Sequence, residues 1–140
     1  MKIEEYLSTL PQSILSGEEI QIPPDTIREI FRFTNLGKND IFYHLGCGDG
    51  TSLSIAREEF NVKNAIGIDN SEKMISEAKK MIDKKNIANI KVIEQDVRQA
   101  EFNDADVILC WFMDPEILED LIDKFKKLKD RKSTRLNSSH

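Results

Sequence analysis

The chain has 140 residues with a slightly low hydrophobic content, a high charged content and a formal net charge of −5. This length predicts one domain with its own core, and the acidic balance argues against a partner that presents nucleic-acid phosphates. No apolar run approaches transmembrane length and residues 1–10 do not resemble a signal peptide, so we expect a cytoplasmic protein without a membrane partner. Cys47 and Cys110 have no metal-ligand spacing, which predicts reduced, buried thiols and no metal site.

The first predicted elements precede the most informative part of the chain. Apolar residues at helical spacing predict a short helix over residues 1–10, and a polar connector follows up to residue 23. Pro23 and Pro24 predict an extended entry to a second helix, with Asp25 as its cap and Gly37 at its C-terminal end. The buried face of this helix is expected to carry Ile27, Ile30 and Phe31.

A glycine-rich turn follows the first predicted strand. Residues 41–50 read IFYHLGCGDG, which predicts a strand over residues 41–45, a turn, and a helix that buries Leu53, Ala56 and Phe60. Glycines without Cβ atoms permit positive φ angles and a close approach of the main chain to a ligand. The spacing GxGxG differs from the GxGxxG of dinucleotide sites, and Asp49 would repel a phosphate. The turn therefore suits a ligand without phosphates, although an ordinary glycine turn is the alternative.

The rest of the chain alternates strands and helices. Short apolar runs predict strands over residues 65–68, 90–94 and 107–111, and the polar link over residues 96–104 is too short for a crossover helix. Asn70 or Ser71 is expected to cap one helix, and Asp114 followed by Pro115 to start another. Their predicted apolar faces are Met74, Ile75, Ala78, Met81 and Ile82 in the first, and Ile117, Leu118, Leu121, Ile122, Phe125 and Leu128 in the second. This alternation predicts a doubly wound α/β fold with a mostly parallel sheet.

The glycine turn resembles motif I of class I S-adenosylmethionine-dependent methyltransferases. The segments IPPDTIREIF and FNVKNAIGID, together with the short third-to-fourth-strand link, more specifically resemble small archaeal protein-lysine methyltransferases. The resemblance covers residues 24–129 and implies the cofactor-binding part of a Rossmann-like fold, truncated after strand four and its helix. Strand four would then be left as a hydrophobic sheet edge. The implied cofactor is S-adenosyl-L-methionine and the implied acceptor is a protein lysine. An RNA or small-molecule acceptor, or a non-catalytic cofactor-binding module, is the alternative.

The resemblance also implies which residues contact the cofactor, while it implies no catalytic residue. Asp69 would accept hydrogen bonds from both ribose hydroxyls. Asp96 would receive the adenine amino group, with the Val97 N–H on a ring nitrogen, and Cys110 and Trp111 would flank the methyl group. The full set is His44, Gly46, Cys47, Gly48, Asp49, Gly50, Asp69, Asn70, Asp96, Val97, Cys110 and Trp111, in which the glycines line the methionine and ribose and Asn70 lies against the adenine.

Several of these residues have a structural alternative. Asp69 is also placed to cap the helix that follows it, Asp96 is a common turn residue, and Trp111 is equally suited to the core. His44 occupies the position where the family usually has an acid that fixes the amino group of the methionine moiety. A protonated His44 would repel that group, so we expect weaker cofactor binding than in relatives with the acid. Asp49 is placed to share the task, and a histidine packed under the turn without a ligand role is the alternative.

Residues 130–140 differ in character from the rest. They read DRKSTRLNSSH, have no apolar periodicity, and resemble the conceptual translation of a sequencing adapter. We therefore expect a non-native tail and leave it out of the fold prediction, with a genuine polar tail as the alternative. The tail holds three basic and one acidic residue, which leaves 17 basic and 24 acidic residues and a net charge of −7 in the body. That charge favours a basic partner, such as a lysine-bearing protein surface.

Overall fold

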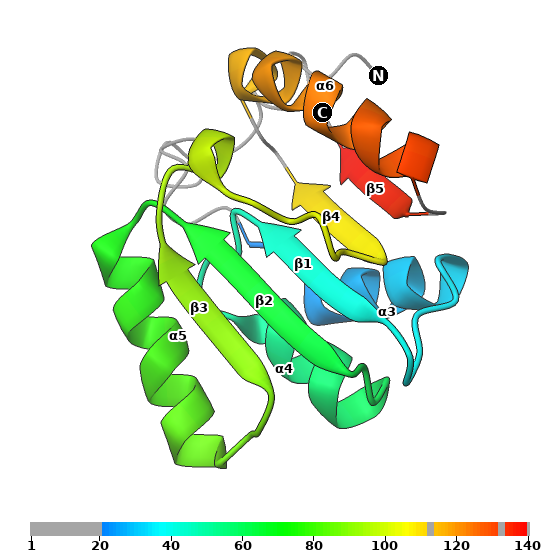
Figure 1. Ribbon diagram of the computed structural model, residues 1–140. Coiled ribbons are helices and arrows are strands. Elements are labelled where there is room, and N and C mark those ends of the chain that lie inside the picture. The colour runs from blue at the N-terminus through cyan, green and yellow to red at the C-terminus, as the bar shows by residue number, and fades with distance from the viewer. Residues whose placement is uncertain (1–20, 112–113, 132–133, 140) are drawn as a thin grey trace, which may run out of the picture.

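A computed structural model describes residues 21–111, 114–131 and 134–139. They form an α/β fold around one five-stranded sheet with the strand order β3-β2-β1-β4-β5, in which every neighbouring pair is parallel (Figure 1). The strands are β1 (Ile41–Leu45), β2 (Asn64–Asp69), β3 (Ile90–Glu94), β4 (Val107–Trp111) and β5 (Arg135–Ser139). The predicted parallel doubly wound sheet is confirmed, whereas the helix expected over residues 1–10 lies outside the described residues. No helix in the described ranges is both long and apolar enough to cross a membrane.

The helices divide between the two faces of the sheet, as the two clusters of core residues show. One cluster joins Phe42 of β1 to α3 (Pro24–Phe33), α4 (Thr51–Glu59) and α5 (Glu72–Lys85). The other joins Tyr43 and Leu45 of β1 to the short 3₁₀ helix η1 (Val97–Gln99) and to α6 (Pro115–Arg131). Successive residues of a strand point to opposite faces, so the central strand supplies both cores. The predicted bounds of β1, β3 and β4 are confirmed, and β2 extends one residue further at each end than predicted.

The second predicted helix, α3, starts and ends differently from the sequence expectation. Pro23 is the N-cap residue and Asp25 lies inside the first turn, so the expected cap is wrong. Proline is pre-organised for the first helical turn, which lets Pro24 start the helix two residues earlier than expected. At the other end Asn35 takes a positive φ of 54°, whereas Gly37 has no positive φ. The expected closing role of Gly37 is therefore wrong, because asparagine also tolerates the left-handed conformation.

The caps of the later helices follow the sequence. Ser71 caps α5 by accepting a hydrogen bond from the Met74 N–H at 3.3 Å. The Asp114 carboxylate accepts one from the Glu116 N–H at 2.8 Å at the start of α6. The predicted apolar face of α6 is buried at Leu118, Leu121, Phe125 and Leu128.

Ile122 is the exception on that face, because it is 44% exposed. Each residue of an α-helix is rotated by about 100° from the previous one. The buried stripe of α6 passes through Leu121, and this rotation carries Ile122 out of it. The expectation that Ile122 belongs to the buried face is therefore wrong.

The sheet does not end at β4, which corrects the expected truncation after strand four and its helix. Residues 135–139 form β5, which pairs with β4 in parallel from Arg135 opposite Val107 to Ser139 opposite Trp111. The physical reason is that β4 is buried along Val107–Cys110 and can use a hydrogen-bonding neighbour on each side.

Polar anchors hold β5 in place, together with Leu136, which packs against the core cluster on the α6 side. The buried Thr134 donates from Oγ1 to the Ala105 carbonyl at 2.9 Å. The Arg135 guanidinium donates to the Thr34 carbonyl at 2.7 Å and forms an ion pair with Asp40. An analysis based on hydrophobic periodicity misses a strand of this kind. The predicted boundaries at residues 24 and 130 stay predictions.

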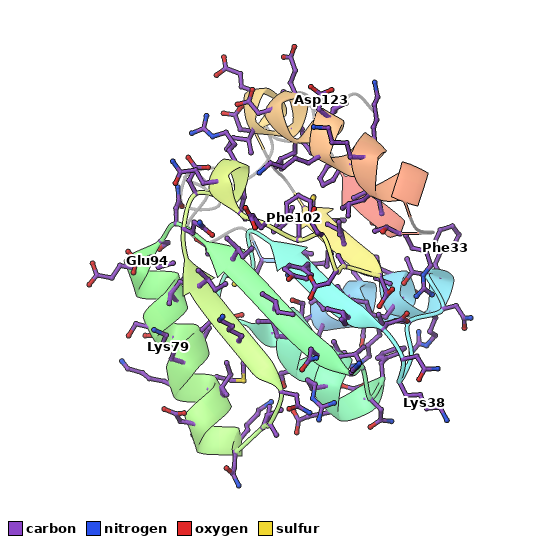
Figure 2. The ribbon with its side chains drawn as sticks, in the orientation of Figure 1. Phe33, Lys38, Lys79, Glu94, Phe102 and Asp123 are labelled. Atoms are coloured by element: carbon purple, nitrogen blue, oxygen red, sulfur yellow. The ribbon has the colours of Figure 1, made fainter. Side chains whose placement is uncertain are left out.

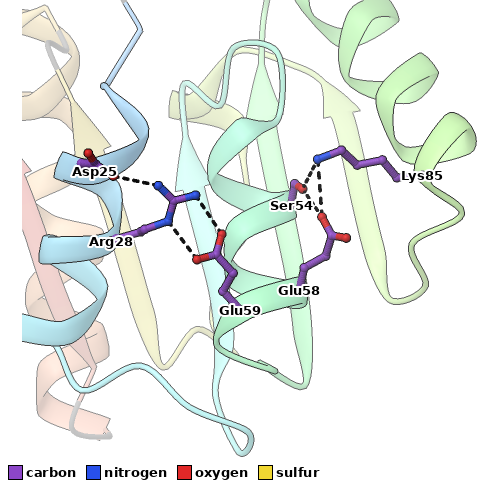
Figure 3. Close-up of polar contacts among 6 residues, drawn as sticks. All are labelled: Asp25, Arg28, Ser54, Glu58, Glu59 and Lys85. Atoms are coloured by element: carbon purple, nitrogen blue, oxygen red, sulfur yellow. Dashed lines mark hydrogen bonds and ion pairs between the residues drawn. The ribbon is translucent and has the colours of Figure 1, made fainter.

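Ion pairs on the surface connect the three helices of one face (Figure 3). Arg28 of α3 donates two hydrogen bonds, of 2.8 and 3.0 Å, to the carboxylate of Glu59 at the end of α4. Lys85 of α5 donates to Ser54 of α4 at 3.1 Å and lies 3.5 Å from Glu58. Such exposed contacts add little stability, so their main effect is to orient α3 and α5 against α4.

Figure 2 contrasts charged side chains on the surface with a buried aromatic side chain on the α6 side of the sheet. The labelled side chains of Lys79, Glu94 and Asp123 point outward from the ribbon. Phe102, in contrast, is buried between the rings of Tyr43 and Phe125, with ring centroids 6.2 and 5.8 Å away. This aromatic contact holds the link between β3 and β4 against α6.

Candidate functional site

The loop of residues 46–50 joins β1 to α4 in a conformation that requires glycine. Gly46, Gly48 and Gly50 have φ angles of 85°, 58° and 84°, which confirms the expected positive values. The N–H groups of Gly46 and Cys47 both donate to the Ile68 carbonyl, at 2.7 and 3.1 Å. The loop is therefore fastened to the carboxyl end of the neighbouring strand β2.

The three glycines face three different environments. A Cβ atom at Gly46 would meet nothing within 4 Å, so the main chain there borders open space. At Gly48 it would lie 2.8 Å from the side-chain carbonyl oxygen of Gln21. At Gly50 it would lie 3.0 Å from a Met81 atom and 3.1 Å from the Cβ of Ala78, both on α5. Gly46 thus permits the approach of a ligand, whereas Gly50 permits the close packing of α4 and α5.

Asp69 stands at the end of β2, beside this loop. One oxygen of its carboxylate accepts a hydrogen bond from the Gly48 N–H at 2.9 Å, and the other accepts one from the Ser71 N–H at 2.9 Å. Each carboxylate oxygen has two lone-pair sites, so the half-exposed side chain keeps capacity for the hydroxyl groups of a ligand. The two expected roles of Asp69, at the helix start and toward a sugar, are compatible in one conformation. Asn70, the next residue, is exposed.

Asp49 has a local role at the start of α4. Its Oδ1 accepts hydrogen bonds from the N–H and the hydroxyl of Thr51, at 3.0 and 2.7 Å. Gly50, the N-cap residue, has no side chain to do this. Asp49 therefore satisfies a main-chain donor that the glycine cap leaves unpaired, and it keeps a negative charge at the loop.

His44 is buried beneath the loop rather than exposed at its surface. Its side chain is only 5% exposed and its Nδ1 lies 2.5 Å from the Ser52 hydroxyl oxygen, while Nε2 has no hydrogen-bond partner among the described residues. Burial lowers the pKa of His44 from 6.5 to about 4, although the negative charge of Asp49 opposes this shift. The imidazole is therefore neutral at pH 7, so the repulsion expected from a protonated His44 does not arise there.

The two cysteines are free and buried, as predicted. The Cys47 sulfur packs against Gly67 of β2, where an added Cβ would lie 2.7 Å from it. Burial raises the pKa of both thiols to about 12. Neither thiol is ionised at neutral pH, and the side chain of Cys110 belongs to the core on the α6 side. Only the main chain of Cys47 and Cys110 is suited to contact a ligand.

Asp96, which follows β3, is held by a residue that the sequence reasoning missed. Arg98 donates to its carboxylate from Nη2 at 2.7 Å, from Nε at 3.1 Å and from the main-chain N–H at 2.9 Å. The hydrogen bonds from the Arg98 side chain and main chain lower the pKa of Asp96 to about 2. A ligand amino group would share this carboxylate with Arg98. The position of Arg98, two residues after the acid, is the sequence feature that could have predicted this ion pair. Val97 is buried in the core on the α6 side.

Trp111 ends β4 on the same face of the sheet as His44. It is partly buried and packs against the core cluster of α3 and α4. Parallel strands bring their carboxyl ends to one edge of a sheet, so Gly46, Asp69, Asp96 and Trp111 all belong to that edge. Within this set the structure records a hydrogen bond from the Gly48 N–H of the loop to the Asp69 carboxylate.

Gln21 was also missed by the sequence reasoning. It belongs to the polar connector ahead of α3, and its side-chain amide lies against Gly48. No motif marks this residue, because its position depends on how the chain folds back over the loop.

Comparisons with known proteins agree on one family. The profile of the methyltransferase domain family matches residues 42–130. The protein-lysine N-methyltransferase of Saccharolobus islandicus is 28% identical over 95 residues, which are 67% of this chain and 59% of that protein. The carboxy-S-adenosyl-L-methionine synthase of Sulfurimonas denitrificans is 36% identical over 103 residues, which are 70% of this chain and 43% of that protein. The chain thus spans roughly half the length of these two relatives.

A solved structure supports the fold. The RNA methyltransferase from Salinibacter ruber, crystallised with S-adenosyl-L-homocysteine, superposes with a TM-score of 0.71 at 18% identity. The match covers 84% of this chain and 71% of that chain. At this identity the likeness concerns the fold alone, and it agrees with the strand order and the two helical layers described above.

Proposed function

Since the chain belongs to the methyltransferase domain family, we propose that it transfers a methyl group from S-adenosyl-L-methionine to a lysine side chain of a protein. The observation that carries the proposal is the hydrogen bond between Asp69 and Gly48, next to the open space at Gly46. A carboxylate is thereby held beside exposed main chain at the carboxyl edge of the sheet. This is the arrangement that a nucleoside with a free sugar diol requires.

The residues at this edge fit the cofactor. Gly46 leaves room for its approach, Asp69 has lone pairs for its ribose hydroxyls, and Asp49 adds negative charge to a loop without a basic residue. Attraction of opposite charges favours a positively charged sulfonium there. When bound, S-adenosyl-L-methionine supplies a methyl group that is already activated by the positive sulfur. The chain's own contribution is to align the cofactor with the acceptor and to exclude water from the reacting groups. Trp111, at the end of β4, would help to exclude water.

The choice of a protein lysine rests on two observations. The relative from Saccharolobus islandicus is a protein-lysine N-methyltransferase, and the region of similarity covers 67% of this chain. The net charge of −5 favours a basic partner and disfavours the phosphate backbone of RNA.

The proposal extends to the organisation and location of the protein. Residues 24–129 form its cofactor-binding part, flanked by residues 1–23 and by the tail of residues 130–140. The proposed location is the cytoplasm, which the two free, buried cysteines support because thiols stay reduced there.

Incubation with methyl-labelled S-adenosyl-L-methionine tests the proposal. The purified chain is given separate pools of protein, RNA and small metabolites, with Asp123→Asn on the exposed side of α6 as an active control. Label in protein that is stable to acid and to base supports a lysine acceptor. Label only in RNA or in metabolites overturns the lysine acceptor but keeps the methyltransferase. If the chain binds S-adenosyl-L-homocysteine in calorimetry without labelling any pool, it is a non-catalytic module, and if it does not bind, the proposed cofactor is wrong.

A further inference from the structure

Gln21 covers the side of Gly48 from which a side chain would project. An ideal Cβ at Gly48 would lie 2.8 Å from the carbonyl oxygen and 2.9 Å from the nitrogen of the Gln21 amide. The whole carboxamide therefore rests on this glycine. The Gln21 amide thus fills the space over the second glycine of the loop, whereas the first glycine borders open space.

The position of Gln21 is fixed by the residues that follow it. Ile22 is 6% exposed and belongs to the core cluster of α3 and α4. Pro23 has an extended conformation with φ −57° and ψ 141°, and Pro24 starts α3. The buried Ile22 and the two prolines restrict the main chain that follows the exposed Gln21 and so keep this residue close to the loop.

The surroundings of the amide are those of the nucleoside half of the site. Gly48, on which it rests, donates its N–H to Asp69. The Gln21 nitrogen also lies 3.6 Å from the sulfur of Met74, in the first turn of α5. Gln21 and Asp69 therefore both contact Gly48 on the side where β2 leads into α5.

We propose that Gln21 is a positioning residue for the bound cofactor, whose carboxamide hydrogen-bonds the nucleoside portion beside Asp69. This inference rests on the proposed function. A carboxamide offers an acceptor and two donors without a charge, so it suits a sugar hydroxyl or a purine edge. A carboxylate at this position would lie near Asp69 and would suffer like-charge repulsion.

Calorimetric titration of the full chain tests this role with two probes. S-Adenosyl-L-homocysteine carries the nucleoside and the amino acid, and 5′-methylthioadenosine carries the nucleoside without the amino acid. We expect Gln21→Leu to weaken both to the same extent, by about 3-fold to 10-fold, as for the loss of one neutral hydrogen bond. Gln21→Glu should weaken both at least as much. Gln99→Leu, an exposed glutamine on η1, is the matched control and should bind as the wild type does.

The outcomes separate this inference from the proposed function. Unchanged affinity of Gln21→Leu for both probes overturns the role of Gln21, while the wild-type binding still supports the cofactor. A loss confined to S-adenosyl-L-homocysteine overturns the assignment to the nucleoside. Absence of wild-type binding overturns the proposed function itself. We expect Gln21→Leu and the wild type to have equal melting temperatures because the side chain is exposed. Equal values would show that a weaker affinity of the variant is not caused by unfolding.

Discussion

The Asp69 carboxylate at the end of β2 accepts a 2.9 Å hydrogen bond from the main-chain N–H of Gly48, the middle glycine of the loop after β1. Its other oxygen accepts one from the Ser71 N–H at the start of α5. One side chain therefore holds the glycine loop and the first turn of a helix in a fixed relation. The acceptor for the Gly48 N–H therefore comes from the end of β2 and not from the loop itself, which helps the loop to keep its shape.

Replacement of Asp69 by asparagine should separate binding from folding. The asparagine side chain keeps the size of the aspartate but is uncharged and has one acceptor oxygen, so both N–H groups lose a charged partner and one of them also loses its acceptor. Hydrogen bonds to charged groups are worth about 1.5–3 kcal/mol, so we expect the affinity for S-adenosyl-L-homocysteine to fall at least roughly 10-fold. Calorimetry measures this, and Asp123→Asn should leave the affinity unchanged. An unaltered affinity in Asp69→Asn would contradict the proposed sugar contact.

Alanine at the glycines should distinguish ligand approach from packing. Gly50→Ala adds a Cβ within 3.1 Å of α5 at a positive φ, so we expect a loss of about 2–4 kcal/mol in the free energy of unfolding. Gly46→Ala meets no atom within 4 Å, so it should cost only the strain of its φ, about 1–2 kcal/mol, and mainly weaken cofactor binding. Gly37→Ala, with open space and no positive φ, is the control for urea unfolding. Equal loss of stability at Gly46 and Gly50 would refute the distinction.

His44 should make folding pH-dependent. Its pKa is about 4 in the folded chain and near 6.5 when unfolded, so protonation favours the unfolded state. The stability that the neutral imidazole allows is present above pH 6.5 and is lost progressively as the pH falls toward 4. At 1.36 kcal/mol per pKa unit, the loss is on the order of 3 kcal/mol.

Urea unfolding across this pH range, compared between the wild type and His44→Gln, isolates that contribution. His140→Gln is the matched control because the sequence has two histidines. We expect the pH dependence to flatten in His44→Gln and to persist in His140→Gln. Parallel curves for the wild type and His44→Gln would show that His44 does not titrate with folding.

The packing of α6 predicts opposite results at two adjacent residues. Leu121 is fully buried against β4 and η1, so Leu121→Ala should cost about 2–5 kcal/mol in the free energy of unfolding. Ile122 is 44% exposed, and Ile122→Ala should cost less than about 1 kcal/mol. Chemical denaturation of both variants measures the difference. Similar losses at the two positions would mean that α6 is rotated relative to the arrangement described.

Deletion of residues 134–140 tests β5. Without this strand the apolar β4 would present its unpaired edge, and exposed edges pair with other chains. The deletion also removes the anchors that Thr134 and Arg135 make to Ala105, Thr34 and Asp40. We expect self-association in light scattering and a lower melting temperature. A monomeric product that melts as the full chain does would show that residues 134–140 are dispensable, as their resemblance to a translated adapter implies.

Part of the fold was predictable because it depends on residues close in sequence. The bounds of β1, β3 and β4 were predicted correctly. In β1 and β4 the signal was a mostly apolar run, since central parallel strands are buried on both faces. Ser71 and Asp114 were identified as caps because a cap bonds to an N–H two or three residues away. The end of α3 was missed at Gly37, because Asn35 satisfies the same conformational need.

The sequence by itself determined the glycine loop, its position after a buried strand, and the acid that ends the next strand. These features depend on backbone freedom and strand burial, both of which are local properties. Only the tertiary structure decided that Gln21 lies against Gly48, that His44 is neutral, that Arg98 pairs with Asp120 of α6, and that Arg135 bonds to Thr34. Each of these depends on contacts or burial that arise when distant parts of the chain come together in the fold. Local sequence patterns do not specify such contacts.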